Sequence, residues 1–138
     1  MSDLPLDGQV AIVTGAAGGL GRVLSLGLAS EGASVVCADL DEEGAGETAD
    51  LVAGSGQDSL VVAVDVADEE SVRQMAQATV ARFGRIDILV NNAAIYATLE
   101  RKAFTDISIE ERDRAIDVNL RGPWLCARAA FPAMRDQQ

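Results

Sequence analysis

Residues 10–21 read Val10-Ala-Ile-Val-Thr14-Gly15-Ala-Ala-Gly18-Gly19-Leu20-Gly21. The run Val10–Thr14 has no polar alternation, which is typical of a strand buried on both faces of a parallel sheet. Gly15, Gly19 and Gly21 then allow a sharp turn, and a helical apolar pattern follows. A strand, a glycine turn and a helix in this order aim the free amides of the helix N-terminus at an anion. The stretch therefore predicts a turn that cradles phosphate.

The same kind of apolar run recurs along the chain. Strands are expected at Val10–Thr14, Ser34–Ala38, Leu60–Val64 and Ile86–Val90. Helical patterns separate them, at about residues 20–28, 42–53 and 72–83. Strands that alternate with helices predict right-handed βαβ crossovers. We therefore expect an α/β fold with a doubly wound, Rossmann-like parallel sheet and a single domain over residues 1–138.

Local signals mark where helices begin and end. Asp68 is a candidate N-cap and Gly84 a candidate stop for the third helix. The sequence Ser108-Ile-Glu-Glu111 is a capping box, which predicts one long final helix towards Arg135. Residues 54–56 and 97–105 are expected to be loops.

Composition excludes several classes of function. A formal net charge of −11 argues against binding to nucleic acid or to an anionic membrane, and no apolar run is long enough to span a bilayer. The absence of histidine removes Ser-His-Asp hydrolysis and the common zinc sites. Two cysteines, Cys37 and Cys126, have no metal-ligand spacing and are expected to be buried small hydrophobes. We expect a cytoplasmic protein.

The glycine spacing G-x-x-x-G-x-G differs from the common dinucleotide pattern G-x-G-x-x-G. A triphosphate site is excluded because no Gly-Lys-Ser/Thr follows the turn. Taken alone, the spacing leaves open a tight strand-to-helix turn that binds nothing.

Asp39 ends the second predicted strand, some two dozen residues after the first glycine. A carboxylate there can accept hydrogen bonds from both hydroxyls of an adenosine ribose, although a solvated acid at a strand end is the alternative. It would repel a 2′-phosphate by roughly 1 to 4 kcal/mol at about 4 Å. Neither Gly18 nor Leu40 supplies a compensating positive charge. The sequence therefore favours NAD over NADP.

Two further motifs follow the third and fourth predicted strands. Asp65-Val66 lies where a carboxylate and a backbone amide would meet an adenine ring. Asn91-Asn92-Ala93-Ala94 pairs two amides, which can tie loops together, with two small residues that let the backbone pass close to a ligand. An Asn-rich turn without a ligand is the alternative interpretation.

Asn119 lies four residues before Pro123 within the predicted final helix. Proline has no N–H, so the carbonyl of Asn119 loses its helical partner and can accept a hydrogen bond from a water or a side chain. A simple kink eased by Gly122 is the alternative.

In this order, these motifs closely resemble the short-chain dehydrogenase/reductase family, over the N-terminal half of that family's domain. The resemblance implies a set of cofactor-binding positions: Thr14, Gly15, Gly19, Leu20, Gly21, Asp39, Leu40, Asp65, Val66, Asn92, Ala93 and Ala94. Within this set, it places Thr14, Gly15, Gly19 and Gly21 around the loop that binds the pyrophosphate. It also implies a catalytic role for Asn119, whose carbonyl would hold a water of a proton relay.

The family transfers hydride between a nicotinamide and an alcohol or carbonyl carbon, using a Ser, a Tyr and a Lys one helical turn after the Tyr. Here the single tyrosine, Tyr96, is followed four residues later by Glu100, and the single lysine, Lys102, is six residues away. A tyrosine needs a cation on the same helix face to act near neutral pH. We therefore expect a domain truncated before its catalytic Tyr/Lys segment, unable to catalyse alone.

The resemblance also implies a strand order of 3-2-1-4, which leaves the fourth strand as an exposed edge. Such an edge invites pairing with another chain. We expect a homo-oligomer, or self-association through this edge and the last helix, and a small alcohol or carbonyl substrate for the complete form.

Two alternatives remain at this point. One is a stand-alone nucleotide-binding or sensor module that acts with a partner at the exposed edge. The other is a methyltransferase in which Asp39 holds the ribose of S-adenosylmethionine. Thr14, the Asn91-Asn92 pair and the Asn119 helix fit the second alternative poorly.

Overall fold

The computed structural model describes residues 4–96 and 99–137. Strands and helices alternate in its first part: β1 Val10–Thr14, α1 Gly19–Ser30, β2 Ser34–Asp39, α2 Glu42–Gly54, β3 Ser59–Ala63, α3 Glu69–Phe83 and β4 Ile88–Val90. Helical segments follow: a 3₁₀ turn Phe104–Asp106, α4 Ile109–Ile116, a π-helical turn Asp117–Arg121 and α5 Gly122–Asp136.

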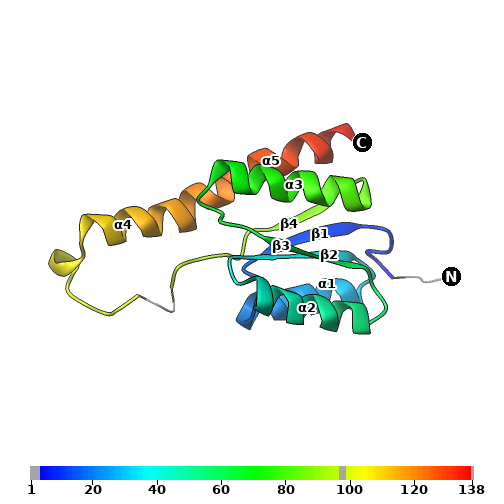
Figure 1. Ribbon diagram of the computed structural model, residues 1–138, viewed down its shortest axis with the longest axis horizontal. Helices are drawn as coiled ribbons and strands as arrows, with labels where there is room; N and C mark the ends of the chain where they lie inside the picture. The colour runs from blue at the N-terminus through cyan, green and yellow to red at the C-terminus, as the bar shows by residue number, and fades with distance from the viewer. Residues whose placement is uncertain (1–3, 97–98, 138) are drawn as a thin grey trace.

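The four strands form one parallel sheet in the order β3-β2-β1-β4. Helices α1 and α2 cover one face, and α3 and α5 cover the other (Figure 1). This is the Rossmann-like, doubly wound arrangement and the strand order that the sequence predicted. β1 lies between β2 and β4, so the carboxyl ends of these three strands meet at the same edge of the sheet.

The core has two halves, one on each face of the sheet. Ile12 and Val36 pack towards α3 and α5, whereas Val13 and Val35 pack towards α1 and α2. All four side chains are fully buried. Successive residues of a strand point to opposite faces, so a strand covered on both sides needs an unbroken apolar run.

Cys37 and Cys126 are both buried, as predicted, and carry free thiols. Burial raises the pKa of each thiol to about 11, and for Cys37 a hydrogen bond with Ser25 opposes that rise. Both cysteines therefore remain protonated near neutral pH and act as small core residues.

Several local predictions are confirmed by the hydrogen bonds. The Asp68 side chain caps α3 by accepting from the amide of Glu70, and Gly84 ends that helix in the left-handed conformation. Ser108 and Glu111 form both hydrogen bonds of a capping box at the start of α4. These signals are short-range, which is why the sequence alone could locate them.

The fourth strand is shorter than the predicted Ile86–Val90. The side chain of Gln137 accepts from the amide of Ile86 and donates to its carbonyl. The carboxylate of Asp87 accepts from the amide of Val10 at 2.8 Å. A side chain thus takes both backbone bonds of Ile86, whereas Asp87 keeps one backbone bond to β1, its amide donating to the carbonyl of Val10 at 2.9 Å. β4 begins at Ile88.

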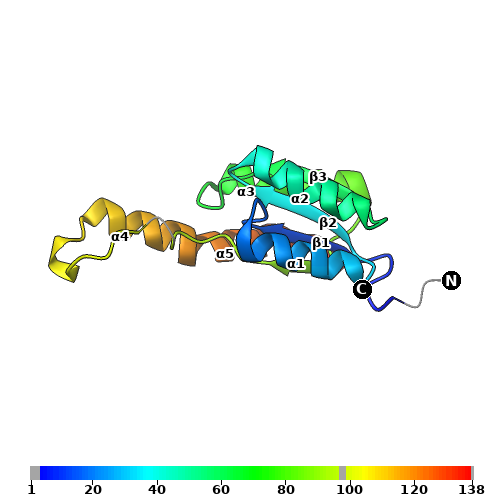
Figure 2. The same ribbon diagram turned by 90° about the horizontal axis from the view of Figure 1, so that it is seen from below.

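The predicted long final helix is observed as one helical run from Ile109 to Asp136, but it is not α-helical throughout. The π-helical turn at residues 117–121 divides it, and the amide of Gly122 donates to the carbonyl of Asp117, five residues earlier. Pro123 cannot donate a backbone hydrogen bond, so the regular α-helical ladder is interrupted just before it. α4 and the segment before it project away from the sheet in both views (Figures 1 and 2). Among the described residues, no helix combines the length and apolar content needed to cross a bilayer.

Candidate functional site

The glycine turn joins β1 to α1 at the carboxyl edge of the sheet. Gly15 and Gly19 have φ of +69° and +52°, a left-handed conformation that other L residues rarely adopt. Gly21 is needed for a different reason, because a Cβ built there would lie 1.9 Å from the carbonyl oxygen of Gly15. The first turn of α1 therefore packs directly against the start of the glycine turn.

The N-terminus of α1 is open to an anion. Gly18 precedes the helix and makes no side-chain capping bond, and the first turn carries no acidic residue. A Cβ added at Gly18 or Gly19 would meet no atom within 4 Å, so there is space above the turn. The first amides of a helix lack partners within the helix and lie at its positive end. The turn can therefore receive a phosphate group.

Thr14 and Asn92 join the end of β1 to the segment after β4. The Thr14 hydroxyl accepts from the amides of Asn92 and Ala93 at 3.1 and 3.0 Å. The Asn92 side chain donates to the carbonyls of Thr14 and Gly15 at 3.1 and 3.2 Å. These four bonds hold Ala93 beside the glycine turn, in agreement with the prediction that an asparagine here ties loops together.

Replacing Asn92 with leucine is expected to lower the free energy of unfolding by about 1 to 3 kcal/mol, because the carbonyls of Thr14 and Gly15 lose their donor. Urea unfolding measures this. The matched control is Asn91→Leu at the neighbouring exposed amide, which should stay within about 0.5 kcal/mol of the unsubstituted chain. Equal losses in the two variants would contradict the role given to Asn92.

Asp39 ends β2 beside the glycine turn, and both of its carboxylate oxygens are engaged. One oxygen accepts from the amide of Ala17 at 2.9 Å, and the other accepts from the amide of Asp41 at 3.0 Å. Each oxygen keeps lone pairs for a further donor, since a carboxylate accepts about four hydrogen bonds. Asp39 is therefore a fixed acceptor at the edge of the sheet.

Asp65 and Val66 lie in the loop between β3 and α3, separated from the strand by Val64 alone. One Asp65 oxygen accepts from the amide of Ala67 at 2.9 Å, and Val66 is buried. Asp65 thus reaches the same edge of the sheet as Asp39, as the sequence predicted.

A cleft of about 160 Å³ opens where these strand ends meet. Its lining comprises Gly15, Asp39, Leu40, Val64, Asp65, Val66, Ala93, Ala94, Ile95, Arg114 and Val118. Seven of these are predicted cofactor-binding positions, drawn from four separate segments of the chain. The cleft is smaller than the 300 to 1,000 Å³ typical of small-molecule pockets, so it suits one part of an extended ligand.

The remaining predicted residues surround this cleft without lining it. Thr14 and Asn92 bond the end of β1 to the segment after β4. Gly19, Leu20 and Gly21 form the start of α1. Leu20 is exposed.

Asn119 belongs to the π-helical turn and lies in the lining of a different cleft, of about 430 Å³, beside α4. Its side-chain amide pairs with the backbone of Ile95, accepting at 2.7 Å and donating at 3.0 Å. It therefore fixes the segment that follows Ala94 against the last helix. Although this second cleft is larger, the smaller one gathers the carboxylates and the glycine turn, so we place the site there.

The single tyrosine and the single lysine do not form a proton-transfer pair. Tyr96 is 81% exposed, and the Lys102 ammonium lies 2.7 Å from a carboxylate oxygen of Glu111. Lys102 is thus paired with a carboxylate, and the expectation that this chain cannot catalyse alone stays a prediction.

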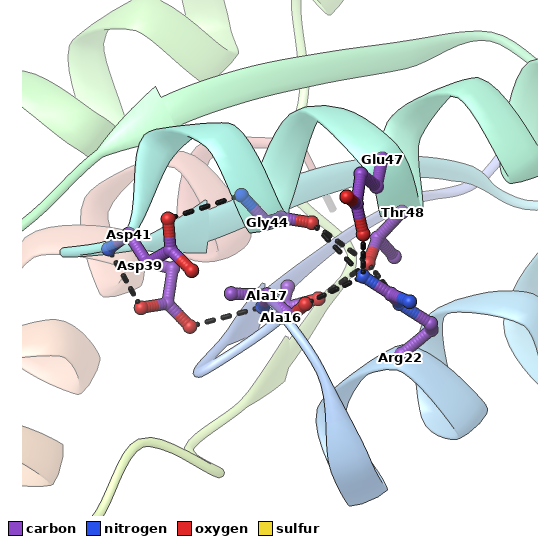
Figure 3. Close-up of polar contacts among 8 residues, drawn as sticks. All are labelled: Ala16, Ala17, Arg22, Asp39, Asp41, Gly44, Glu47 and Thr48. Carbon is purple, nitrogen blue, oxygen red and sulfur yellow. Dashed lines mark hydrogen bonds and ion pairs between the residues drawn. The ribbon is translucent and has the colours of Figure 1, made fainter.

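The structure adds residues that the sequence analysis did not select, among them Arg114, Arg22 and Thr48. Arg114, from α4, lines the cleft. Arg22 and Thr48 lie behind the glycine turn, where they link it to α2 (Figure 3). The sequence did offer an indication of Arg22. A cation in the first turn of a helix is unfavourable, because it lies at the positive end of the helix dipole, so hydrogen-bond acceptors are expected near it.

Comparison with known proteins agrees with this geometry. Residues 9–138 match the sequence profile of short chain dehydrogenases. Over 123 residues the chain is 42% identical to an uncharacterized oxidoreductase of Thermotoga maritima, covering 89% of this chain and 47% of that protein. It is 39% identical to the D-threitol dehydrogenase of Mycolicibacterium smegmatis over 132 residues, 96% of this chain and 50% of that one.

A solved structure shows the same fold. The crystal structure of a short chain dehydrogenase from Mycobacterium paratuberculosis bound to NAD has a TM-score of 0.89 at 30% identity, covering 96% of this chain and 52% of that chain. This chain spans about half the length of these three proteins. With a profile match over nearly all of its residues, the chain belongs to the short-chain dehydrogenase family.

Proposed function

We propose that this chain forms the NAD-binding part of a short-chain oxidoreductase. The observation that carries the proposal is the juxtaposition, at one edge of the sheet, of an open helix N-terminus after a glycine turn and the fixed carboxylate of Asp39. The first suits a pyrophosphate and the second suits ribose hydroxyls. The relative from Mycobacterium paratuberculosis, which has the same fold, is bound to NAD.

Different residues are assigned to different parts of the cofactor. Gly15, Gly19, Leu20 and Gly21 would hold the pyrophosphate, and Asp39 and Leu40 the adenosine ribose. The adenine would lie in the cleft, against Asp65, Val66 and the Ala93-Ala94 backbone. When bound, NAD supplies the hydride-accepting nicotinamide, while this part of the chain binds and orients it.

Selection of NAD over NADP is part of the proposal. Asp39 stands at the end of β2, where a 2′-phosphate would meet its negative charge. The cleft is also lined by one cation, Arg114, and by two carboxylates, those of Asp39 and Asp65. These three side chains together carry a net negative charge, which disfavours a phosphate.

We extend the proposal to the activity of the whole protein, as hydride transfer between NAD(H) and a small alcohol or carbonyl compound. Asn119 is then the residue we assign to its catalytic machinery. Within the 138 residues, no tyrosine is followed by a lysine four positions later. We therefore expect cofactor binding without turnover from this chain on its own. The cytoplasmic location remains a prediction.

Self-association is proposed through β4, which forms one edge of the sheet, and through the last helix. Trp124 and Phe131 of α5 are 58% and 57% exposed, which is unusual for such large apolar side chains. Sedimentation velocity across a concentration series tests this part of the proposal. A monomer at all concentrations would contradict it.

Calorimetric titration of the purified 138-residue chain with NAD and with NADP tests the cofactor proposal. We expect saturable NAD binding with one site per chain and weaker NADP binding. A folded, soluble chain that binds neither cofactor would contradict it, and equal affinities would contradict the selectivity assigned to Asp39.

A further inference from the structure

Arg22 connects the glycine turn to α2 (Figure 3) and does not belong to the lining of the cleft. We propose that Arg22 is a positioning residue for the dinucleotide and a determinant of its selectivity. It acts through the backbone of Ala17, which in turn sets the carboxylate of Asp39. This inference rests on the proposed function and adds a residue to it.

The guanidinium reaches acceptors on both elements. Its Nη2 donates to the carbonyl of Ala17 at 2.7 Å and to the carbonyl of Gly44 at 3.3 Å. Its Nε donates to the Thr48 hydroxyl at 2.9 Å. The planar fork of an arginine can satisfy several acceptors in fixed directions, which a lysine ammonium cannot match.

Both backbone polar groups of Ala17 are held. Its carbonyl accepts from Arg22, and its amide donates to Asp39 at 2.9 Å. If this carbonyl were released, the peptide group that follows the Ala17 amide would lose its anchor, and the amide that orients Asp39 would be held from one side only. Arg22 therefore acts on the ribose-binding carboxylate without touching it.

Thr48 provides a second link between α2 and the turn. Its side chain is fully buried, and its hydroxyl donates to the carbonyl of Ala16 at 2.7 Å while accepting from Arg22. Through Arg22 and Thr48, the turn is bound to α2 at two consecutive residues, Ala16 and Ala17. The turn and α2 thus hold their relative position as one unit.

The ion pair with Glu47 is the weakest part of this arrangement. The atoms lie 2.8 Å apart, but the Glu47 side chain is 63% exposed, and exposed ion pairs contribute little. The bonds to Ala17, Gly44 and Thr48 lie deeper, so they carry the positioning role. Glu47 is therefore a suitable control position.

The test uses three variants of the 138-residue chain. Arg22→Met keeps the apolar stem and removes every donor. Arg22→Lys keeps a cation that can still reach one carbonyl. Glu47→Gln removes only the surface charge. NAD and NADP affinities are measured by calorimetry, and the exchange rates of the Ala17 and Asp41 amides are measured by NMR without ligand.

In Arg22→Met, we expect NAD affinity to fall about tenfold, and NADP affinity to fall less, so that the preference for NAD shrinks. The Ala17 amide should exchange about tenfold faster. Arg22→Lys should recover part of both losses, and Glu47→Gln should stay within about twofold of the unsubstituted chain. A structural defect alone would lower both affinities equally and would leave the preference unchanged.

An unchanged NAD preference or unchanged Ala17 exchange in Arg22→Met would overturn the inference. If the unsubstituted chain bound no NAD, the proposed function would be wrong, and so would the proposed effect of Arg22 on NAD binding. The exchange of Ala17 would then still decide whether Arg22 holds the turn, so the two failures are distinguishable.

Discussion

Replacing Gly21 with alanine is expected to lower the free energy of unfolding by about 3 kcal/mol or more and to abolish NAD binding. The new Cβ would lie 1.9 Å from the Gly15 carbonyl oxygen and 2.8 Å from the Asn92 side-chain nitrogen. The first of these is backbone, so the first turn of α1 must move away from the glycine turn. Urea unfolding and calorimetric titration measure the two effects.

The same helix offers a matched control. Gly27 also lies in α1, but a Cβ there would meet no atom within 4 Å. Gly27→Ala should stabilise the chain by about 0.5 to 1 kcal/mol, because alanine favours the helix, and should leave NAD binding unchanged. Near-normal stability and binding in Gly21→Ala would show that α1 does not need its close approach to the turn.

Asp39→Ala is expected to reduce the preference for NAD over NADP by about two to five orders of magnitude. Two contributions add: the lost hydrogen bonds from ribose hydroxyls to a charged acceptor, about 1.5 to 3 kcal/mol, and the removed repulsion of the 2′-phosphate, roughly 1 to 4 kcal/mol. Titrations with both cofactors give the ratio. Some stability is lost as well, because the amides of Ala17 and Asp41 lose their acceptor.

Two further variants separate charge from hydrogen bonding. Asp39→Asn keeps an acceptor of the same size and should raise NADP affinity while keeping part of the NAD affinity. Asp50→Asn removes the same charge from an exposed position on α2 and should leave the ratio unchanged, because salt screens distant charges. A shift in Asp50→Asn as large as that in Asp39→Asn would mean that net charge, not the ribose site, sets the preference.

Much of the fold follows from local sequence because it depends on buried strands and on caps. β1 was predicted at its observed bounds, Val10–Thr14, because an unbroken apolar run ends there at the glycine turn. The start of β4 depends instead on contacts with residues far away in sequence. Gln137 takes the backbone bonds of Ile86 across 51 residues, and no local pattern reports that.

Site residues could be predicted from the sequence where a glycine or a carboxylate stands at the end of a predicted strand. Gly15, Asp39 and Asp65 follow consecutive strands of a parallel sheet, so topology alone brings them to one edge. Arg114 and Arg22 could not be selected in this way, because their roles depend on how α4 reaches the cleft and how α2 packs against the turn. A long side chain that bonds to a different helix or loop leaves no local pattern, so such residues could not be predicted from the sequence.

The central claim is that a dinucleotide lies across the glycine turn and the ends of β2 and β3. The most direct measurement is an NMR titration of the ¹⁵N-labelled chain with NAD. The account predicts saturable shifts concentrated in the amides of residues 15–21, 39–41, 65–67 and 92–95, with the exposed face of α3 unaffected. Saturable binding with shifts centred on the larger cleft beside α4, or no shifts in the glycine turn, would contradict it.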